Sequence, residues 1–424
     1  MHMIIKSLVA RKIFDSRGNP TIEAEVVVKG DGKVCTGKAA APSGASKGKH
    51  EVVAFPEGRV DASIKVIKKI LAPKLVGASA DEQKKIDSLL HDLDGTPNFS
   101  KIGGNTAVAI SMAIAKAMAV AEGLPLYKHL GGERAVHLPY PLGNVIGGGA
   151  HAGKQAPDIQ EFQAMPVGAG SFVDAASANS YVHKRAKALI EAKNGTFAGG
   201  KGDEGAWAPN LDSLQALDIL AEACRQVSDE IGFEVRPSID VATSSLYDER
   251  KKKYIYKRDG KSRDEGEQID FIVGLIEDYK LFYVEDPLHE EDFDGFAELT
   301  RKVGKKCLIC GDDIFVTNVV RIQKGIKAGA ANAVLIKPNQ IGTLSDTLEA
   351  IELAKQHRYI PVISHRSGET PDKTIAHLAV GWGCPIIKTG VVGGERIAKL
   401  NELIRIEEEL GKKAKMGELP FREC

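Results

Sequence analysis

The chain has 424 residues, of which 43% are hydrophobic, so it is too long for one ordinary core and too apolar to be disordered. We expect two domains, or one small domain and a barrel of about 250 residues. Lysine plus arginine equals aspartate plus glutamate at 57 each, and this lack of net charge disfavours nucleic acid or an anionic membrane as a partner.

Targeting signals and cysteines predict a soluble, cytoplasmic protein. Lys6 and Arg11 interrupt the apolar start of the chain, which offers no small-residue cleavage site and does not predict a secretory signal. Nowhere do 18 apolar residues run together, because Lys116 interrupts the most apolar helix. The six cysteines have no framework spacing, which fits a reducing compartment. Cys307 and Cys310 lie in an apolar run typical of a strand, so we expect burial and no zinc or redox role.

The N-terminal third predicts an α+β domain over residues 1–134. Alternating apolar and polar positions predict a three-stranded antiparallel meander, with strands at Ile4–Phe14, Thr21–Val28 and Lys33–Ala40. Helical periodicity then covers Val60–Leu75, Asp81–Leu93 and Asn105–Gly123. The remaining residues, 135–424, are expected to form the second domain.

From Leu138 onward, short apolar runs alternate with amphipathic helices, which is typical of parallel strands in a βα repeat. Six of the runs end in a polar or ionisable residue, namely Asp240, Glu285, Asp312, Lys337, His365 and Lys388. The last four intervals between them are 23–28 residues, the length of one strand, one helix and two connections. The first interval is 45 residues and contains Leu246–Arg258, which reads as an inserted hairpin.

Two earlier strands, at Leu138–Asn144 and Ile159–Met165, bring the count to eight. Eight strands with functional groups at six successive ends favour a TIM-like (β/α)8 barrel, whose strand ends open onto one catalytic face. An open doubly wound sheet would gather its functional groups at one switch point instead.

Three carboxylates, Asp240, Glu285 and Asp312, are expected to converge at the barrel mouth. Anions this close raise one another's pKa unless a cation lies among them. An all-oxygen ligand set selects a hard divalent ion, and few carboxylates favour Mg²⁺ over Ca²⁺. The alternative is that each acid forms a salt bridge with Lys337 or Lys388. A lysine beside Mg²⁺ and another cation has a lowered pKa and can act as a base, and Lys337 is the better candidate.

Motifs along nearly the whole chain resemble those of the enolase family. They are Asp15-Ser16-Arg17-Gly18-Asn19-Pro20-Thr21, Ser43-Gly44-Ala45-Ser46, Gly202-Asp203-Glu204-Gly205, Glu285-Asp286-Pro287, Gly311-Asp312-Asp313, Ile336-Lys337-Pro338-Asn339-Gln340-Ile341-Gly342, Ser364-His365-Arg366-Ser367-Gly368-Glu369-Thr370, Ile387-Lys388-Thr389-Gly390 and Arg405-Ile406-Glu407-Glu408. The resemblance implies reversible dehydration of 2-phosphoglycerate to phosphoenolpyruvate, with two Mg²⁺ ions per site. It also implies an enolase-type barrel behind an N-terminal capping domain.

The resemblance also implies a role for each site residue. Asp240, Glu285 and Asp312 would bind the first Mg²⁺, and Lys337 would remove the C2 proton. Lys388 would neutralise the substrate carboxylate. Glu204 would protonate the departing hydroxide with help from Glu161. The remaining expected contacts to substrate and site wall are Arg366, Ser367 and His151 at the phosphate, Ser46 at the phosphate and the second Mg²⁺, and His365 in the wall.

Some positions depart from the family pattern, and two alternatives remain. Trp207 follows the Asp-Glu-Gly motif where a small residue is usual, and Gly393-Gly394 replace an arginine and a small residue. The alternatives are a superfamily relative acting on another carboxylate, and a non-catalytic binding protein that keeps the fold. A small-molecule substrate is the expected partner, and the resemblance implies a homodimer or a homo-octamer.

Overall fold

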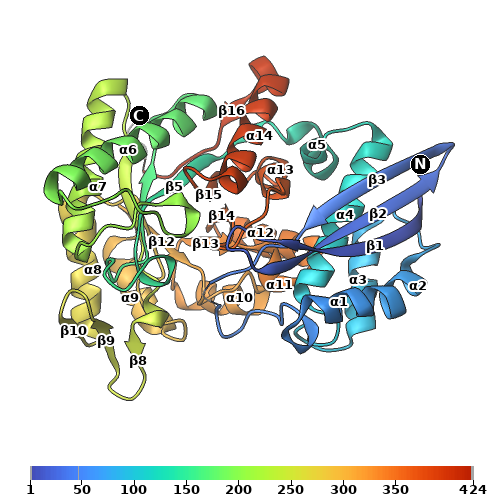
Figure 1. Ribbon diagram of the computed structural model, residues 1–424, viewed down its shortest axis with the longest axis horizontal. Coiled ribbons are helices and arrows are strands. Elements are labelled where there is room, and N and C mark those ends of the chain that lie inside the picture. The colour runs from blue at the N-terminus through green and yellow to red at the C-terminus, as the bar shows by residue number, and fades with distance from the viewer. Residues whose placement is uncertain (1, 46, 422–424) are drawn as a thin grey trace.

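The computed structural model describes residues 2–45 and 47–421. A three-stranded sheet and its helices lie on one side of the molecule, and a barrel surrounded by helices lies on the other (Figure 1). The elements of the first part are β1 (Ile4–Phe14), β2 (Pro20–Gly30), β3 (Lys33–Ala40), α1 (Val60–Val66), α2 (Ala72–Leu75), α3 (Gln83–Asp94), α4 (Gly104–Glu122) and α5 (Leu126–Gly131).

The antiparallel meander predicted from the alternation is confirmed, in the order β1-β2-β3. All three predicted helices form as well, and the first contains a π turn at Ile67–Leu71 between α1 and α2. Pro73 follows this turn and has no N–H to donate into the helix, so the ladder widens just before it.

Helix α4 forms the core between the sheet and the rest of the chain. It is the one helix of the described residues that is long and apolar enough to cross a membrane, but 89% of its apolar window is buried inside the fold. Its alanines allow a very close approach to β3, where a Cβ on Gly37 would lie 2.0 Å from the Ala113 carbonyl oxygen. Burial on all sides therefore explains its composition.

Eight strands close into a barrel in the order β11-β12-β13-β14-β15-β5-β6-β7, as predicted. Its strands are β5 (Tyr140–Gly147), β6 (Glu161–Met165), β7 (Arg236–Asp240), β11 (Tyr283–Glu285), β12 (Leu308–Gly311), β13 (Ala333–Ile336), β14 (Ile360–Ser364) and β15 (Ile386–Gly390). The helices around it are α6 (Phe172–Lys193), α7 (Ser213–Ile231), α8 (Glu265–Tyr279), α9 (Phe293–Val303), α10 (Val319–Ala328), α11 (Pro338–Ile341), α12 (Leu344–Gln356), α13 (Thr374–Gly381) and α14 (Gly394–Leu410). A short parallel pair, β4 (His137–Leu138) and β16 (Lys415–Met416), lies outside it.

The barrel departs from the expected all-parallel repeat at one strand. β6 runs antiparallel to both β5 and β7. The segment from Gly148 to Gln160 contains only a 3₁₀ turn, and a direct loop of this kind joins antiparallel strands, whereas a parallel pair needs a crossover helix. The first residue of β6 therefore lies at the end of the barrel where the other strands finish.

The predicted hairpin is a three-stranded antiparallel sheet, so this prediction was one strand short. Its strands are β8 (Tyr247–Asp248), β9 (Lys253–Tyr256) and β10 (Lys261–Arg263). A turn with Gly260 at φ +65° adds the third strand. The expected burial of Cys307 and Cys310 is confirmed, since both are fully buried with free thiols.

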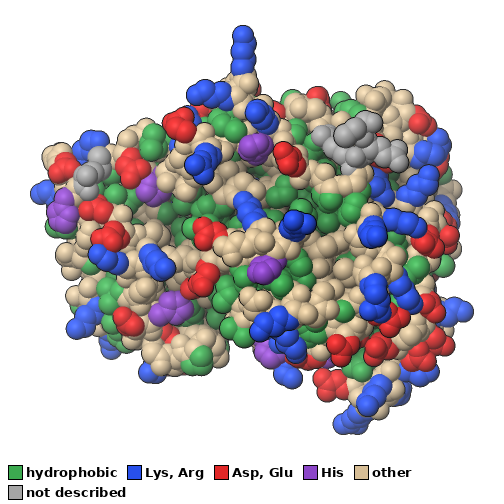
Figure 2. Space-filling model, turned by 180° about the vertical axis from the view of Figure 1, so that it is seen from behind, with side chains coloured by type: hydrophobic (Ala, Val, Ile, Leu, Met, Phe, Trp, Pro, Cys, Tyr) green, Lys and Arg blue, Asp and Glu red, His purple; other side chains and the backbone are tan. Residues whose placement is uncertain are grey.

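Charged side chains of both signs lie among one another over the face shown in Figure 2. This distribution agrees with the zero net charge of the chain. On this face the molecule lacks the one-sign field that would steer it onto a polyanion.

Gly37 tests the packing of the sheet on α4. Gly37→Ala should lower the free energy of unfolding by about 1–3 kcal/mol, because the new methyl group overlaps the backbone of α4. Gly274→Ala, in α8 with open space at the Cβ position, should instead raise it by about 0.5–1 kcal/mol. Urea unfolding measures the free energy of unfolding of both variants. The same change in both would contradict the close packing of β3 on α4.

Candidate active site

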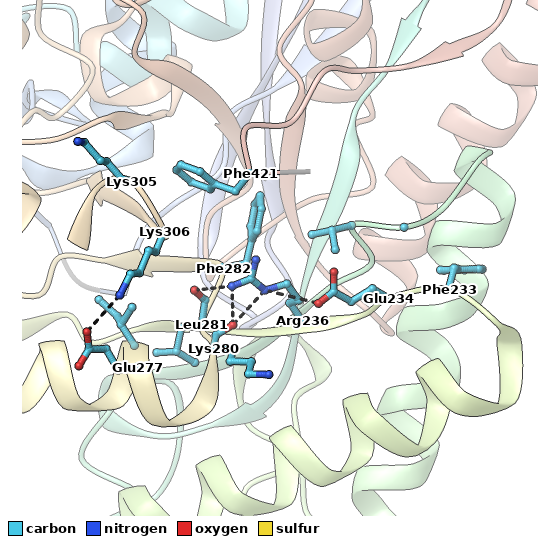
Figure 3. Close-up of a pocket in the computed structure, with 13 residues that line it drawn as sticks. Phe233, Glu234, Arg236, Glu277, Lys280, Leu281, Phe282, Lys305, Lys306 and Phe421 are labelled. Carbon is cyan, nitrogen blue, oxygen red and sulfur yellow. Dashed lines mark hydrogen bonds and ion pairs between the residues drawn. The ribbon is translucent and has the colours of Figure 1, made fainter. Parts of the chain in front are cut away.

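The largest hollow lies at the N-terminal ends of the barrel strands (Figure 3). Its charged groups are engaged in structural contacts. The Arg236 guanidinium donates to the Lys280 carbonyl oxygen at 3.0 and 2.8 Å, and Lys306 pairs with Glu277 at 3.4 Å. Residues at this end of a (β/α)8 barrel usually serve stability. Catalytic groups in this fold lie at the opposite end, where the strands finish.

A small cavity at that opposite end contains the predicted site. It encloses about 20 Å³, enough for one water molecule. The residues that line it are Gly44, His151, Gln160, Glu161, Glu204, Asp240, Asp312, Lys337, Ser364, His365, Arg366, Ser367 and Lys388. Among the described residues, each predicted site residue lines it except Glu285, which contacts Lys388. The predicted Ser46 lies outside the described residues.

Three carboxylates occupy one row across neighbouring strands. Glu161 of β6 is paired in register with Asp240 of β7, and Asp240 with Glu285 of β11. Asp240 and Glu285 are the last residues of their strands, whereas Glu161 is the first residue of antiparallel β6. The reversed strand thus brings Glu161 to the barrel mouth.

Lys388, in β15, joins these three carboxylates. Its Nζ lies 2.9 Å from Asp240 Oδ2, 2.7 Å from Glu285 Oε1 and 3.2 Å from Glu161 Oε1. Burial raises the pKa of Glu285 to about 8, with Asp240 as the next contribution, and Lys388 opposes both. The carboxylates raise the pKa of Lys388 well above its usual value despite burial, so this lysine stays charged.

Lys337 follows β13 directly and forms an ion pair with Asp312, which follows β12. Burial acts to lower the pKa of Lys337, but Asp312 outweighs it and raises this pKa above the usual value. The sequence predicted a lowered pKa for Lys337 beside Mg²⁺ and another cation, and this stays a prediction for the metal-bound site. Without a metal the nearest partner of Lys337 is a carboxylate, while Arg366 and Lys388 act more weakly in the lowering direction.

A buried cluster is formed by Glu161, Glu204 and His151. One potential metal-ligand atom of each lies within 4.8 Å of those of the other two. Burial, and next the charge of Glu204, raise the pKa of Glu161 well above its usual value. Burial also acts to raise the pKa of Glu204, but His365 and His151 outweigh it and hold this pKa well below the usual value. The two environments push the pKa values of the pair apart, so a proton is favoured on Glu161 over Glu204.

Glu204 lies on a tight turn that aims its carboxylate into the cavity. Its backbone has φ +65°, a left-handed conformation that is uncommon outside glycine and typical of functional sites. Asn144 Nδ2 donates to Glu204 Oε2 at 3.0 Å, and His365 Nε2 lies 3.2 Å from Glu204 Oε1. The turn and these two contacts fix the position of the carboxylate.

Arg366 and Ser367 follow β14 and face the loop after β3. Glu51 binds the Arg366 guanidinium with both oxygens, each at 3.0 Å from a terminal nitrogen. The Ala45 amide donates to Ser367 Oγ at 2.6 Å. Burial lowers the pKa of Arg366, but Glu51 outweighs it and the pKa is raised. An always charged, planar fork with a nearby hydroxyl suits a bidentate oxyanion.

Trp207 lies against the turn that carries Glu204. Its ring stacks on His183 with centroids 4.6 Å apart, and its Nε1 donates to the His183 carbonyl oxygen at 2.8 Å. Burial lowers the pKa of His183 to about 4, and its Nε2 contacts the Gly205 carbonyl oxygen at 3.0 Å. Trp207 therefore ties the Glu204 turn to α6.

Among the described residues, two groups of carboxylate and imidazole side chains have the spacing to hold a metal ion. One is the cluster of His151, Glu161 and Glu204, and the other is Asp286, Asp312 and Asp313. The predicted ligands Asp240 and Glu285 contact Lys388, and Asp312 contacts Lys337, so the ion pairs of the alternative interpretation are present in the structure.

Sequence reasoning missed several residues that shape the cavity. Glu51 lies five residues after the Ser43-Gly44-Ala45-Ser46 motif and binds Arg366. Gln160 immediately precedes Glu161, and its Nε2 lies 3.5 Å from Asp240 Oδ2. Arg396, which is fully buried, contacts His365 from α14. Glu51 and Gln160 could have been found from the sequence because each is a polar residue close to a predicted site residue or motif. For Arg396, only its position beside Glu395 could have suggested a role.

Comparison with known proteins gives one consistent family. Residues 5–130 match the family model described as enolase, N-terminal domain, and residues 135–422 match enolase, C-terminal TIM barrel domain. A protein named enolase from Methanothermobacter thermautotrophicus is 56% identical over 99% of this chain and all of its own length. Enolases from Methanosphaera stadtmanae and Pyrobaculum aerophilum are 57% and 51% identical, over 97% and 98% of this chain and 98% and 99% of their own.

Trp207 tests how the Glu204 turn is held. Trp207→Ala should cost about 3–5 kcal/mol of unfolding free energy and speed amide exchange over residues 202–207. Trp207→Phe keeps a ring against His183 but loses the Nε1 donor, and should cost about 1–3 kcal/mol. Denaturant unfolding and hydrogen exchange measure these effects. Trp382→Phe, in a different part of the chain, is the control, and unchanged loop exchange in Trp207→Ala would contradict the role.

Proposed function

Because the chain belongs to the enolase family, its activity is the reversible dehydration of 2-phosphoglycerate to phosphoenolpyruvate, and we propose that the cavity at the barrel mouth catalyses it. The observation that carries this assignment is the convergence in one buried cavity of a lysine pair, a glutamate pair whose pKa values are pushed apart, and an arginine fork. These are the base, the acid and the phosphate site that the reaction requires.

Lys337 removes the C2 proton. Its Nζ reaches the cavity from the end of β13, and its side chain is only 11% exposed, so water does not compete strongly for it. Asp312 is what favours the ammonium form, and Lys388 and Arg366 favour the neutral amine. Lys337 therefore becomes a base once the charge of Asp312 is engaged elsewhere. Lys388 remains charged and binds the substrate carboxylate.

Glu204 and Glu161 protonate the leaving hydroxide as a pair. The raised pKa of Glu161 favours a proton there, and Glu204 is the member held by the Asn144 hydrogen bond, with His365 beside it. The proton is passed within this pair to the departing oxygen, and the low water content of the cavity prevents its loss to solvent. In the reverse direction the same pair takes a proton from water.

Arg366, Ser367 and His151 bind the phosphate. Glu51 already occupies the Nη1–Nη2 edge of Arg366, so a phosphate that binds this edge displaces Glu51. The Ala45 amide on Ser367 Oγ shows that the loop beside Ser46 lies over this site. By its resemblance to the family, Ser46 would contact the phosphate.

The donors at the mouth fit a divalent cation. Asp240, Glu285 and Asp312 are buried carboxyl groups at the ends of neighbouring strands, and hard oxygen donors of this kind suit Mg²⁺. Asp240, Glu285 and Asp312 would hold one Mg²⁺, and Ser46 would contribute to a second. When bound, Mg²⁺ supplies positive charge that stabilises the dianion formed after proton loss.

The remaining assignments rest on the family and on the charge pattern. We place the protein in the cytoplasm as a homodimer or homo-octamer, with a capping domain at residues 1–134 and a barrel domain at 135–424. A small molecule is its substrate, and the level charge balance argues against nucleic acid or membrane partners. A different superfamily substrate or a non-catalytic role is disfavoured by full-length relatives that are named enolase.

An ultraviolet assay tests the activity directly. With 2-phosphoglycerate and Mg²⁺ the protein should produce phosphoenolpyruvate, and EDTA should abolish the absorbance rise until Mg²⁺ is restored. Mg²⁺ at 100 times its Kd should add about 2.7 kcal/mol to the free energy of unfolding. Asp240→Asn should lose this stabilisation, and Asp270→Asn, which is exposed, should keep it. No product from the native protein would refute the assignment.

Isotope exchange separates the base from the acid. Lys337→Ala should abolish exchange of the C2 proton with solvent, because the proposed base is removed and Lys388 is engaged with three carboxylates. Glu204→Gln should retain this exchange while phosphoenolpyruvate formation falls by about 10²–10⁴-fold. Lys327→Ala, on an exposed part of α10, is the control and should change neither rate. Retained exchange in Lys337→Ala, or its loss in Glu204→Gln, would reverse the roles.

A further inference from the structure

A buried arginine outside the cavity holds three consecutive site residues. Arg396 lies in the first turn of α14 and is 0% exposed. Its Nη1 is 2.7 Å from His365 Nδ1 and donates to the Arg366 carbonyl oxygen at 2.6 Å. Its Nη2 donates to the Ser367 carbonyl oxygen at 2.6 Å. One guanidinium thus fixes the segment that carries the wall histidine and the phosphate site.

The contact with His365 determines where the imidazole carries its proton. A guanidinium is charged at any physiological pH and has only donors. His365 Nδ1 must therefore accept with its lone pair, and a neutral ring then carries its proton on Nε2. Nε2 is the atom that lies 3.2 Å from Glu204 Oε1. Arg396 in this way places the ring proton on the nitrogen nearest the Glu204 carboxylate, in a close contact that lacks the alignment of a hydrogen bond.

The Arg396 guanidinium lies 2.7 Å from His365 Nδ1 and leaves no room for a proton there, so the ring has one proton to place. His365 is 2% exposed, and burial lowers its pKa to about 3. The charge of Arg396 acts in the same direction, whereas Glu204 opposes it. A doubly protonated ring would place a proton on Nδ1 against the guanidinium, which the 2.7 Å contact does not permit.

We propose that Arg396 is a positioning residue that locks neutral His365 in its Nε2–H tautomer and thereby keeps the positive N–H edge of the ring beside the Glu204 carboxylate for the hydroxide step. Through the two carbonyl contacts it also holds the backbone from which Arg366 and Ser367 reach the cavity. The role of Glu204 rests on the proposed function, but the tautomer does not, because it is a property of the protein without substrate.

A neighbouring lysine on the same helix provides a matched control. Lys399 is also buried, and its Nζ donates to the Thr370 carbonyl oxygen at 2.6 Å and pairs with Glu369 at 3.5 Å. It thus supplies a buried cation from α14 to the same loop without reaching His365. Loss of Lys399 tests what removal of a buried charge does to the loop in general.

The first test is the tautomer itself, measured by ¹⁵N–¹H NMR of histidine side chains in the full protein. Comparison with His365→Asn identifies the His365 signals among the 11 histidines. In the native protein, Nε2 should carry the proton and Nδ1 should not, and a protonated Nδ1 would overturn the proposal without any variant. Arg396→Lys should shift the population toward Nδ1–H, and Lys399→Met should leave it unchanged. An unshifted population in Arg396→Lys would also overturn the proposal.

The second test uses the separation of the two chemical steps. Arg396→Lys should lower kcat for phosphoenolpyruvate formation by about 100-fold while C2 proton exchange continues, since Lys337 is untouched. Lys399→Met should keep the native ratio of exchange to dehydration. Equal loss of exchange and dehydration in Arg396→Lys would indicate a structural role only and overturn the positioning role. A native protein with the expected tautomer and no dehydration would refute the proposed function and leave the tautomer lock intact.

Discussion

The contact between Lys388 and three carboxylates is the interaction on which the site depends. A single ammonium group within 3.2 Å of Asp240, Glu285 and Glu161 links four strands of the barrel at one level. Burial of these acids would be very costly without a cation among them, and burial of the lysine would be equally costly without the acids. The barrel provides this arrangement because β15, β6, β7 and β11 present these residues at the same end. Catalytic power and a large electrostatic demand on the fold therefore arise from the same groups.

Much of the fold could be predicted from the sequence because local patterns decide it. Period-two alternation located the meander, and the regular spacing of Glu285, Asp312, Lys337, His365 and Lys388 located the later strands. The direction of β6 could not be obtained this way, because an apolar run has the same pattern whichever way the strand points. The third strand at Lys261–Arg263 was missed because a short, exposed and charged strand has no hydrophobic signal.

The site residues were predicted from strand ends and family motifs, whereas their partners were not. Asp240 and Lys388 could be named from position, but their contact joins residues 148 positions apart. The ion pair between Lys337 and Asp312 was not predicted as the main contact, and it raises the pKa of Lys337 in the absence of a metal. Arg396 was missed since a helical arginine is most often on the surface, and only tertiary packing buries this one.

The Glu51–Arg366 pair gives the proposed phosphate site a built-in competitor. Because Glu51 is tethered to the same chain, it acts at a high effective concentration that no free monocarboxylate in solution matches. A singly charged anion gains too little binding energy from Arg366 to displace Glu51. A phosphoryl dianion gains more, since it carries more charge and more acceptor oxygens. The fork thus screens its ligands by charge before any of them reaches Lys337.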